Sequence, residues 1–187
     1  MSSTAEKIMD VAETLIRARG YQGFAFREIA DAVGIKSASV HYHFPTKGDL
    51  VLATMDRYAQ RFELALNNID SKTEAPIEKL NQYIEMFRRE MHEDRNLTLC
   101  IMLGADIAVV PDTVVKALKE FYSLNLNWLS TQLSESMNDQ ACQNLTSRAS
   151  YMLASLHGAL IGARSLNEHH YFEMVVAELE RELIAPK

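Results

Sequence analysis

Apolar side chains recur every three or four residues along most of this 187-residue chain. That spacing places them on one face of an α-helix and predicts an all-α fold of about nine helices. Only seven glycines and four prolines interrupt the pattern. The longer predicted helices cover residues 1–20, 51–66, 77–91, 97–109, 112–129, 147–166 and 171–184. Breaks are expected at residues 67–76, 92–96 and 136–146.

The residues around Gly34 predict two short helices joined by a tight turn, at about 27–32 and 37–44. Glycine suits the turn because it readily adopts the left-handed backbone conformation that other side chains disfavour. Val40 and Phe44 lie four residues apart and should point inward together. Two helices joined in this way, the second with one face left free, form a helix-turn-helix, which is a DNA-reading arrangement.

Composition strengthens this interpretation, because the chain has a net charge of -6 yet carries no aspartate or glutamate from Ala32 to Gly48. A surface that faces a phosphate backbone must avoid negative charge. The first fifty residues hold six basic and six acidic side chains, so the acidity belongs to the remainder. Within the acid-free window, Lys36 and the residues that follow it offer a cation, small hydroxyl groups and aromatic rings suited to bases and phosphates.

The next helix should begin just after Pro45. Thr46 and Asp49 are three residues apart and predict a capping pair. Lys47 falls in the first turn of that helix, where free backbone N–H groups and a lysine together make a site for a phosphate. The continuing apolar face to Leu66 indicates one stiff helix shared by a DNA-binding domain at 1–50 and a helical domain at 51–187.

Residues 6–55 resemble the DNA-binding domain of the tetracycline-repressor (TetR/AcrR) family. The matching residues are Arg19-Gly20-Tyr21, Phe26-Arg27-Glu28-Ile29-Ala30, Val33-Gly34-Ile35, Tyr42-His43-Phe44, Lys47 and Leu50. The resemblance implies that Ser37, Ala38, Ser39 and His41 read bases, while Tyr42, His43 and Lys47 hold phosphates and Arg27 lies near the backbone. It also implies a ligand-responsive regulator, most often a repressor, that binds duplex DNA as a homodimer on a palindromic operator.

This chain departs from the family pattern where hydroxyl residues usually open the two short helices. Phe24-Ala25 precedes the first helix and Lys36 precedes the second. One alternative is that Ser37 caps the second helix, which would remove its hydroxyl from base contact.

The last two predicted helices are the candidates for the dimer interface. Small residues recur every four positions on the first, and apolar residues form a stripe on the second. The predicted interface residues are Ala154, Gly158, Gly162, Phe172, Val175, Leu179 and Leu183. Periodicity alone allows these stripes to be buried within one chain instead, and the resemblance favours a four-helix bundle between two chains.

The middle helices are candidates for an effector site. The predicted lining residues are Phe87, Met91, Cys100, Met102, Phe121, Tyr122, Trp128, Met152 and His157. A filled hydrophobic core would explain the same pattern, and His157 would then be a core histidine. Cys100 is expected in the first turn of a helix near Arg95, which would lower the pKa of its thiol and make it an electrophile sensor. The alternative is a small buried apolar residue.

The chain lacks the usual signatures of an enzyme. It has no Gly-x-Ser-x-Gly elbow, phosphate-cradling glycine loop or His-Glu-x-x-His pair, and no cofactor is expected. Glu168-His169-His170 is interpreted as a solvated turn and not as a metal site. The uncharged run at 149–163 is too short for a membrane span, and Cys100 and Cys142 suit a reducing compartment, so a cytoplasmic location is expected. The competing class is a helical protein-interaction or small-molecule-binding module without specific DNA binding.

Overall fold

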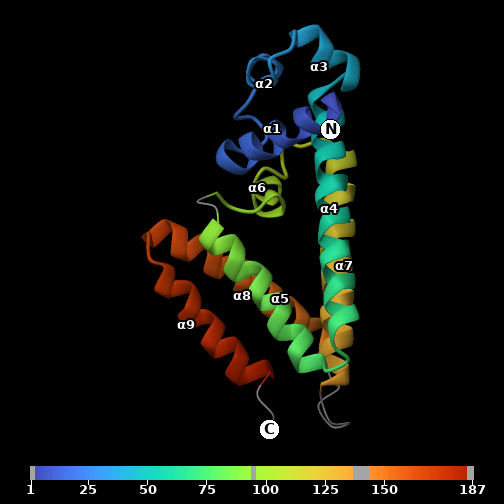
Figure 1. The fold of residues 1–187 in the computed structure, drawn as a ribbon. Helices are drawn as coiled ribbons and strands as arrows, with labels where there is room; N and C mark the ends of the chain where they lie inside the picture. The colour runs from blue at the N-terminus through green and yellow to red at the C-terminus, as the bar shows by residue number, and fades with distance from the viewer. Residues whose placement is uncertain (1–2, 94–95, 137–143, 185–187) are drawn as a thin grey trace. The chain divides into compact units, whose positions relative to one another are not determined.

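A computed structural model describes residues 3–93, 96–136 and 144–184. Every regular element within these ranges is helical, which confirms the predicted all-α class (Figure 1). Three helices come first: α1 (Thr4–Arg19), α2 (Phe26–Val33) and α3 (Ser37–His43). Their apolar faces meet in one small core, where Ile8, Ile16, Ile29 and Val40 are fully buried. The amino-terminal region is therefore a three-helix bundle, as the sequence predicts.

The following helices are longer. They are α4 (Lys47–Lys72), α5 (Pro76–Glu93), α6 (Leu99–Ala105) and α7 (Asp112–Glu135). The predicted break at 67–76 begins too early, because α4 continues to Lys72 and keeps Leu66 and Ile69 buried on its apolar face. The helix predicted at 97–109 is shorter in the structure, since α6 ends at Ala105 and Asp106 occupies its carboxyl-terminal cap position.

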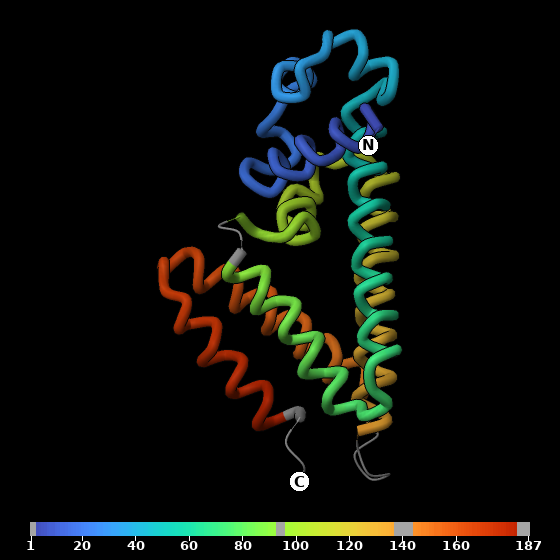
Figure 2. The backbone as a smooth tube through the Cα atoms, in the orientation of Figure 1, coloured from blue at the N-terminus to red at the C-terminus, as the bar shows by residue number. Residues whose placement is uncertain are grey.

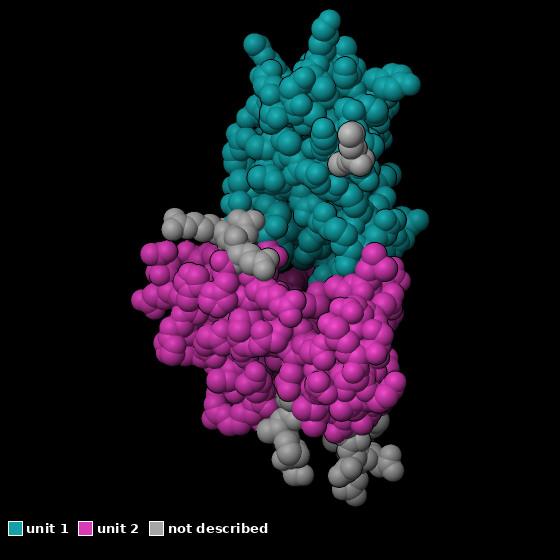
Figure 3. Space-filling model, in the orientation of Figure 1, with its two compact units in different colours: residues 1–62, 96–121 teal, residues 63–95, 122–187 magenta. Residues whose placement is uncertain are grey.

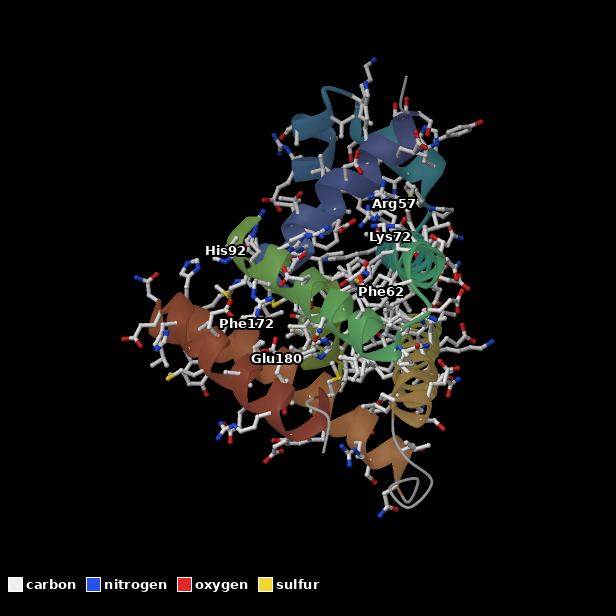
Figure 4. The ribbon with its side chains drawn as sticks, turned by 60° about the horizontal axis from the view of Figure 1, so that its bottom comes forward. Arg57, Phe62, Lys72, His92, Phe172 and Glu180 are labelled. Atoms are coloured by element: carbon white, nitrogen blue, oxygen red, sulfur yellow. The ribbon has the colours of Figure 1, made fainter. Side chains whose placement is uncertain are left out.

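The chain ends in α8 (Leu145–Leu166) and α9 (His169–Leu179), followed by a π-helical turn, Glu180–Ile184. The connection between α8 and α9 is made by Asn167 in the left-handed backbone conformation, with φ of 55°. The two helices run side by side (Figure 2). Phe172, labelled on α9 in Figure 4, is fully buried. Arg88 on α5 forms an ion pair with Glu173 on α9 at 2.9 Å, which ties a third helix to the pair.

The residues form two compact units (Figure 3). Unit 1 contains residues 1–62 and 96–121, and unit 2 contains residues 63–95 and 122–187. Unit 1 thus includes α6, although α6 follows α5 in the sequence. The functional division between residues 50 and 51 stays a prediction.

Candidate nucleic-acid interface

Helix α3 is anchored by one face and open on the other. Val40 is fully buried and Phe44 is 8% exposed, which confirms the predicted inward pair. Ser37, Ala38, His41 and His43 are exposed, and Tyr42 is 85% exposed. Burial would stabilise a side chain as large as tyrosine, so the exposed Tyr42 ring is available to contact a binding partner.

The turn before α3 is built as the sequence predicts. Gly34 has φ of 76°, in the left-handed region, and its N–H donates to the Ala30 carbonyl at 2.9 Å. Lys36 occupies the cap position of α3, and its side chain makes no capping hydrogen bond. Ser37 is the first helical residue and not the cap, so the alternative that Ser37 caps α3 is wrong.

Two carboxylates near the acid-free window, those of Glu28 and Asp49, are held by internal hydrogen bonds. Glu28 accepts from the Ala25 N–H at 2.9 Å and from Arg19 at 3.0 Å. The Ala25 backbone bond and then the Arg19 bond lower the pKa of Glu28. Asp49 accepts from the Thr46 N–H at 3.0 Å, and the Asp49 N–H donates to the Thr46 hydroxyl at 3.1 Å. The predicted capping pair is confirmed, and it keeps the Asp49 carboxylate beside its own helix.

The Lys47 side chain is held by contacts with the segment that connects α1 and α2. Its ammonium donates to the Phe24 carbonyl at 2.7 Å and lies 4.1 Å from the centre of the Phe24 ring and 5.2 Å from that of Tyr21. Burial lowers the pKa of Lys47, and Glu28 partly opposes this effect. The sequence predicts a phosphate anchor, and that role stays a prediction. In this structure the lysine instead closes the α1–α2 connection.

The exposed face of α3 borders a shallow hollow of about 400 Å³. It is lined by Thr4, Ile35, Lys36, Ala38, Ser39, Tyr42 and His43. These residues provide one cation, several hydroxyl groups and an imidazole, without a carboxylate among them. The surface therefore has the polarity needed to face phosphates and base edges.

Two long-range hydrogen bonds hold the α1–α2 turn, and no local pattern in the sequence predicts them. The Asp106 carboxylate accepts from the Tyr21 N–H at 2.6 Å, and the Arg17 side chain donates to the Leu97 carbonyl at 3.0 Å. Gly20 has φ of 77° and lies so close to Asp106 that a β-carbon would collide with its carboxylate. Helix α6 and its flanks therefore help to position the helix-turn-helix.

The predicted effector residues are divided between the units. Cys100, Met102 and Phe121 belong to unit 1, where Phe121 packs between Tyr58 and Phe62 at ring-centre distances of 5.4 and 5.1 Å. Cys100 does lie in the first turn of α6, as predicted, but it is only 1% exposed. Burial raises the pKa of the Cys100 thiol, although hydrogen bonds from Thr98 and Tyr58 oppose the shift. The expected lowering of the thiol pKa is therefore wrong, because desolvation outweighs the helix terminus. A sensor role for Cys100 stays a prediction. Arg95 lies outside the described residues.

Phe87, Met91, Tyr122, Trp128, Met152 and His157 belong to unit 2. His157 lies 5.6 Å from Phe87 and 5.8 Å from Tyr122 between ring centres. Trp128 stacks on Tyr83 and donates to Asp70 at 2.9 Å, while Met152 is fully buried. These contacts bring the aromatic residues together within one unit, where Tyr122, Trp128 and His157 are half-buried. Their use as an effector site stays a prediction.

His157 should make stability depend on pH. Burial lowers its pKa from 6.5 to about 4, so only the unfolded chain takes up this proton between those values. Stability is complete above pH 6.5 and is lost as the pH falls toward 4. Between pH 7 and pH 5 the loss should be about 2 kcal/mol. Denaturant titrations of the wild type and His157→Gln should show this difference in pH dependence. Equal dependence in both proteins would contradict it.

The predicted dimer residues also separate into two groups. Ala154 and Gly158 are exposed on α8, and a β-carbon on Gly158 would meet no other atom within 4 Å. Gly162 is half-buried beneath the Tyr171 ring. Phe172 and Leu179 are at most 1% exposed, so their assignment to an interface is wrong: they pack within unit 2. Val175 is half-buried, and the Leu183 side chain lies outside the described residues.

His169 and His170, which the sequence places in a turn, are instead the first two residues of α9. His169 stacks on His92 with ring centres 5.4 Å apart, and His170 is exposed. Within the described ranges, no group of three or more histidine, cysteine, aspartate or glutamate side chains could hold a metal ion. None of the described helices is both long and apolar enough to cross a membrane. Cys142 lies outside the described residues.

This combination of an all-helical chain and an amino-terminal helix-turn-helix defines the class of helix-turn-helix transcriptional regulators. Residues 8–54 match the family described as "Bacterial regulatory proteins, tetR family". Residues 8–54 therefore carry the DNA-binding region of the TetR family of transcriptional regulators.

Relatives of known name support the family over a longer stretch. The chain is 26% identical over 107 residues to the HTH-type transcriptional regulator CymR of Pseudomonas putida, covering 55% of this chain and 51% of CymR. It is 32% identical over 106 residues to the Staphylococcus aureus biofilm operon icaADBC HTH-type negative transcriptional regulator IcaR, covering 53% of each. The matched segment thus spans about half the length of these relatives.

Solved structures resemble the whole chain. A TetR transcriptional regulator from Legionella pneumophila is 28% identical with a TM-score of 0.91, covering 98% of both chains. A TetR family regulator from Agrobacterium tumefaciens is 27% identical with a TM-score of 0.89, covering 97% of both.

Proposed function

We propose that this regulator is a repressor that binds duplex DNA through α3, acts as a homodimer on a palindromic operator, and is released by a small-molecule effector. The observation that carries the proposal is the exposed, acid-free face of α3. Val40 and Phe44 anchor the opposite face of the helix, and the nearby carboxylates of Glu28 and Asp49 are held by internal hydrogen bonds. IcaR, a relative, is named as a negative regulator, which supports repression.

The contacts divide by chemistry. Ser37, Ala38 and Ser39 are proposed base-reading residues, because the amino-terminal part of a recognition helix approaches base edges. His41 joins them because it lies one turn further along the same side of the helix. Arg27, Lys36, Tyr42 and His43 are the proposed phosphate contacts, and all four are exposed. Lys47 would join them only by leaving the Phe24 carbonyl. Phosphate contacts fix the position of the protein, whereas base contacts choose the sequence.

The proposed dimer interface is the exposed stripe on α8 formed by Tyr151, Ala154, Gly158 and Ile161. Tyr151 is 47% exposed and Ile161 is 41% exposed. Between them, Ala154 and Gly158 leave room for a second helix to approach closely. A stripe of small and apolar residues pairs well with its own copy across a twofold axis.

Ile161→Arg should weaken the dimer at least tenfold, because it would bury an unpaired charge in the interface. Sedimentation equilibrium should show a dimer for the wild type and a monomer for Ile161→Arg at low micromolar concentration. The matched control is Asn81→Arg, which adds the same charge at an exposed position on α5. The stripe would be excluded if Ile161→Arg stayed as dimeric as the control.

The effector is proposed to bind in unit 2, where Phe87, Tyr122 and His157 form an aromatic cluster. Such a site would favour an apolar or aromatic compound with a polar group that reaches the neutral imidazole. In this mechanism the protein represses by occupying the operator, and effector binding releases it from DNA. The effector must therefore bind more tightly to the conformation that does not bind DNA.

Binding-site selection from a random duplex library tests the function. The wild type should select an inverted repeat whose half-sites lie about one helical turn or slightly more apart. Recovery of a single unpaired half-site would contradict the dimer, and recovery of random sequence would contradict specific DNA binding.

A further inference from the structure

We propose that His41 is a specificity-determining residue that selects a base carrying an amino group, adenine or cytosine, over one carrying a keto group. This inference rests on the proposed function, because it assigns one base preference within each operator half-site. It follows from the hydrogen bond at one nitrogen of the imidazole, which fixes what the other nitrogen can do.

The Nδ1 atom of His41 lies 3.4 Å from the Pro45 carbonyl oxygen. A carbonyl oxygen can only accept a hydrogen bond, so the hydrogen of the neutral ring is placed on Nδ1. Nε2 is then left with a lone pair and can only accept. The Pro45 carbonyl, two residues beyond the end of α3, thus determines the hydrogen-bonding character of the outer edge of His41.

The ring is also held in place from its side. Phe26 on α2 packs against it with ring centres 4.7 Å apart and an interplanar angle of 56°. His41 is nevertheless exposed, and it lies one turn after Ser37 on the open side of α3. A ring held at one edge and one side presents its remaining nitrogen in a defined direction, which base discrimination requires.

The major groove provides a simple test of an acceptor. Adenine offers the N6 amino group and cytosine the N4 amino group as donors, whereas guanine O6 and thymine O4 only accept. Opposite an acceptor, guanine or thymine would leave two lone pairs facing each other. The hydroxyl groups of Ser37 and Tyr42 can donate or accept, so they cannot enforce the same choice.

The experiment compares operator selection by the wild type, His41→Phe and His41→Arg at pH 8. At one position of each half-site the wild type should prefer adenine or cytosine about fivefold to tenfold, the value of one well-placed hydrogen bond. His41→Phe keeps an aromatic ring against Phe26 and should lose that preference, while its affinity for random duplex should stay within about twofold. His41→Arg supplies donors and should change the preference to guanine.

His43→Phe is the matched control, because His43 is exposed on the same helix and contacts the rings of Tyr42 and Phe44. It should lower affinity for all sequences and leave the base preference unchanged. The inference is overturned if His41→Phe keeps the wild-type preference, if the position that depends on His41 favours guanine or thymine, or if His43→Phe abolishes the preference. Failure of the wild type to select any operator would instead reject the proposed function. Circular dichroism of each variant confirms that it is folded.

Discussion

Replacing Phe172 with alanine is expected to lower the free energy of unfolding by about 4 kcal/mol, because it removes a fully buried aromatic ring and leaves a cavity. Phe172 has no exposed surface in unit 2, and α9 packs on α8 through this part of its length. Denaturant titration followed by far-ultraviolet circular dichroism measures the change. Phe172→Leu leaves a smaller cavity and should lose about 1–2 kcal/mol, which provides a folded variant if the alanine protein is too unstable.

Met174 is the matched control for Phe172, because it lies two residues away on α9 and is 50% exposed. Met174→Ala should change the free energy of unfolding by less than about 0.5 kcal/mol when both proteins are compared in the same oligomeric state. Phe172 would not belong to the core if Phe172→Ala had the same free energy of unfolding as the wild type but no longer formed a dimer. That outcome would return the residue to an interface between chains.

Ala38→Asp is expected to weaken operator binding by about 100-fold while leaving the fold intact, because it puts a carboxylate opposite the phosphates. Ala38 is exposed in the first turn of α3, where an acidic side chain interacts favourably with the helix dipole. Stability should therefore stay the same or rise by about 0.5 kcal/mol. Opposite effects on binding and stability would separate a surface role from a folding defect.

Gel-shift and fluorescence-anisotropy titrations measure the loss of binding by Ala38→Asp. The control is Asn81→Asp, which adds the same charge at an exposed position in unit 2 and should bind like the wild type within about threefold. Equal loss in both variants would indicate a general charge effect. Wild-type affinity in Ala38→Asp would exclude α3 as the surface that meets DNA.

The features that the sequence predicts correctly depend on residues close together in the chain. Gly34 must turn the chain, Val40 and Phe44 share one helical face, and Thr46 and Asp49 cap the next helix. Each of these follows from backbone geometry over four residues or fewer, and each is confirmed in the structure.

The incorrect or missing predictions concern features that depend on packing between residues far apart in the sequence. The hydrogen bond from the Tyr21 N–H to the Asp106 carboxylate joins residues 85 positions apart. The sequence around either residue gives no sign that the other is its partner. Apolar periodicity identified Phe172 as part of a stripe, but it cannot say whether the partner is the same chain or a second copy. The sequence correctly predicts Cys100 near the start of a helix, yet the pKa of its thiol depends on burial that only the folded structure reveals.

For Lys47 the predicted and the observed contacts differ. Its position in the first turn of α4 predicts a phosphate contact, whereas in the structure its ammonium contacts the Phe24 carbonyl. Lys47 can make both contacts in turn if a DNA phosphate displaces the Phe24 carbonyl from its ammonium group. The salt dependence of binding can count the cations that are engaged.

The most direct measurement is a salt titration of the selected duplex and a random duplex of equal length. With Arg27 and Lys36 of two protomers at phosphates, log affinity should fall against log salt with a slope of about -3.6, or about -5.4 if both copies of Lys47 also engage. The selected duplex should bind at least about 1,000-fold more tightly than the random one. Equal affinity for the two duplexes, or no binding of either at low salt, would contradict the account.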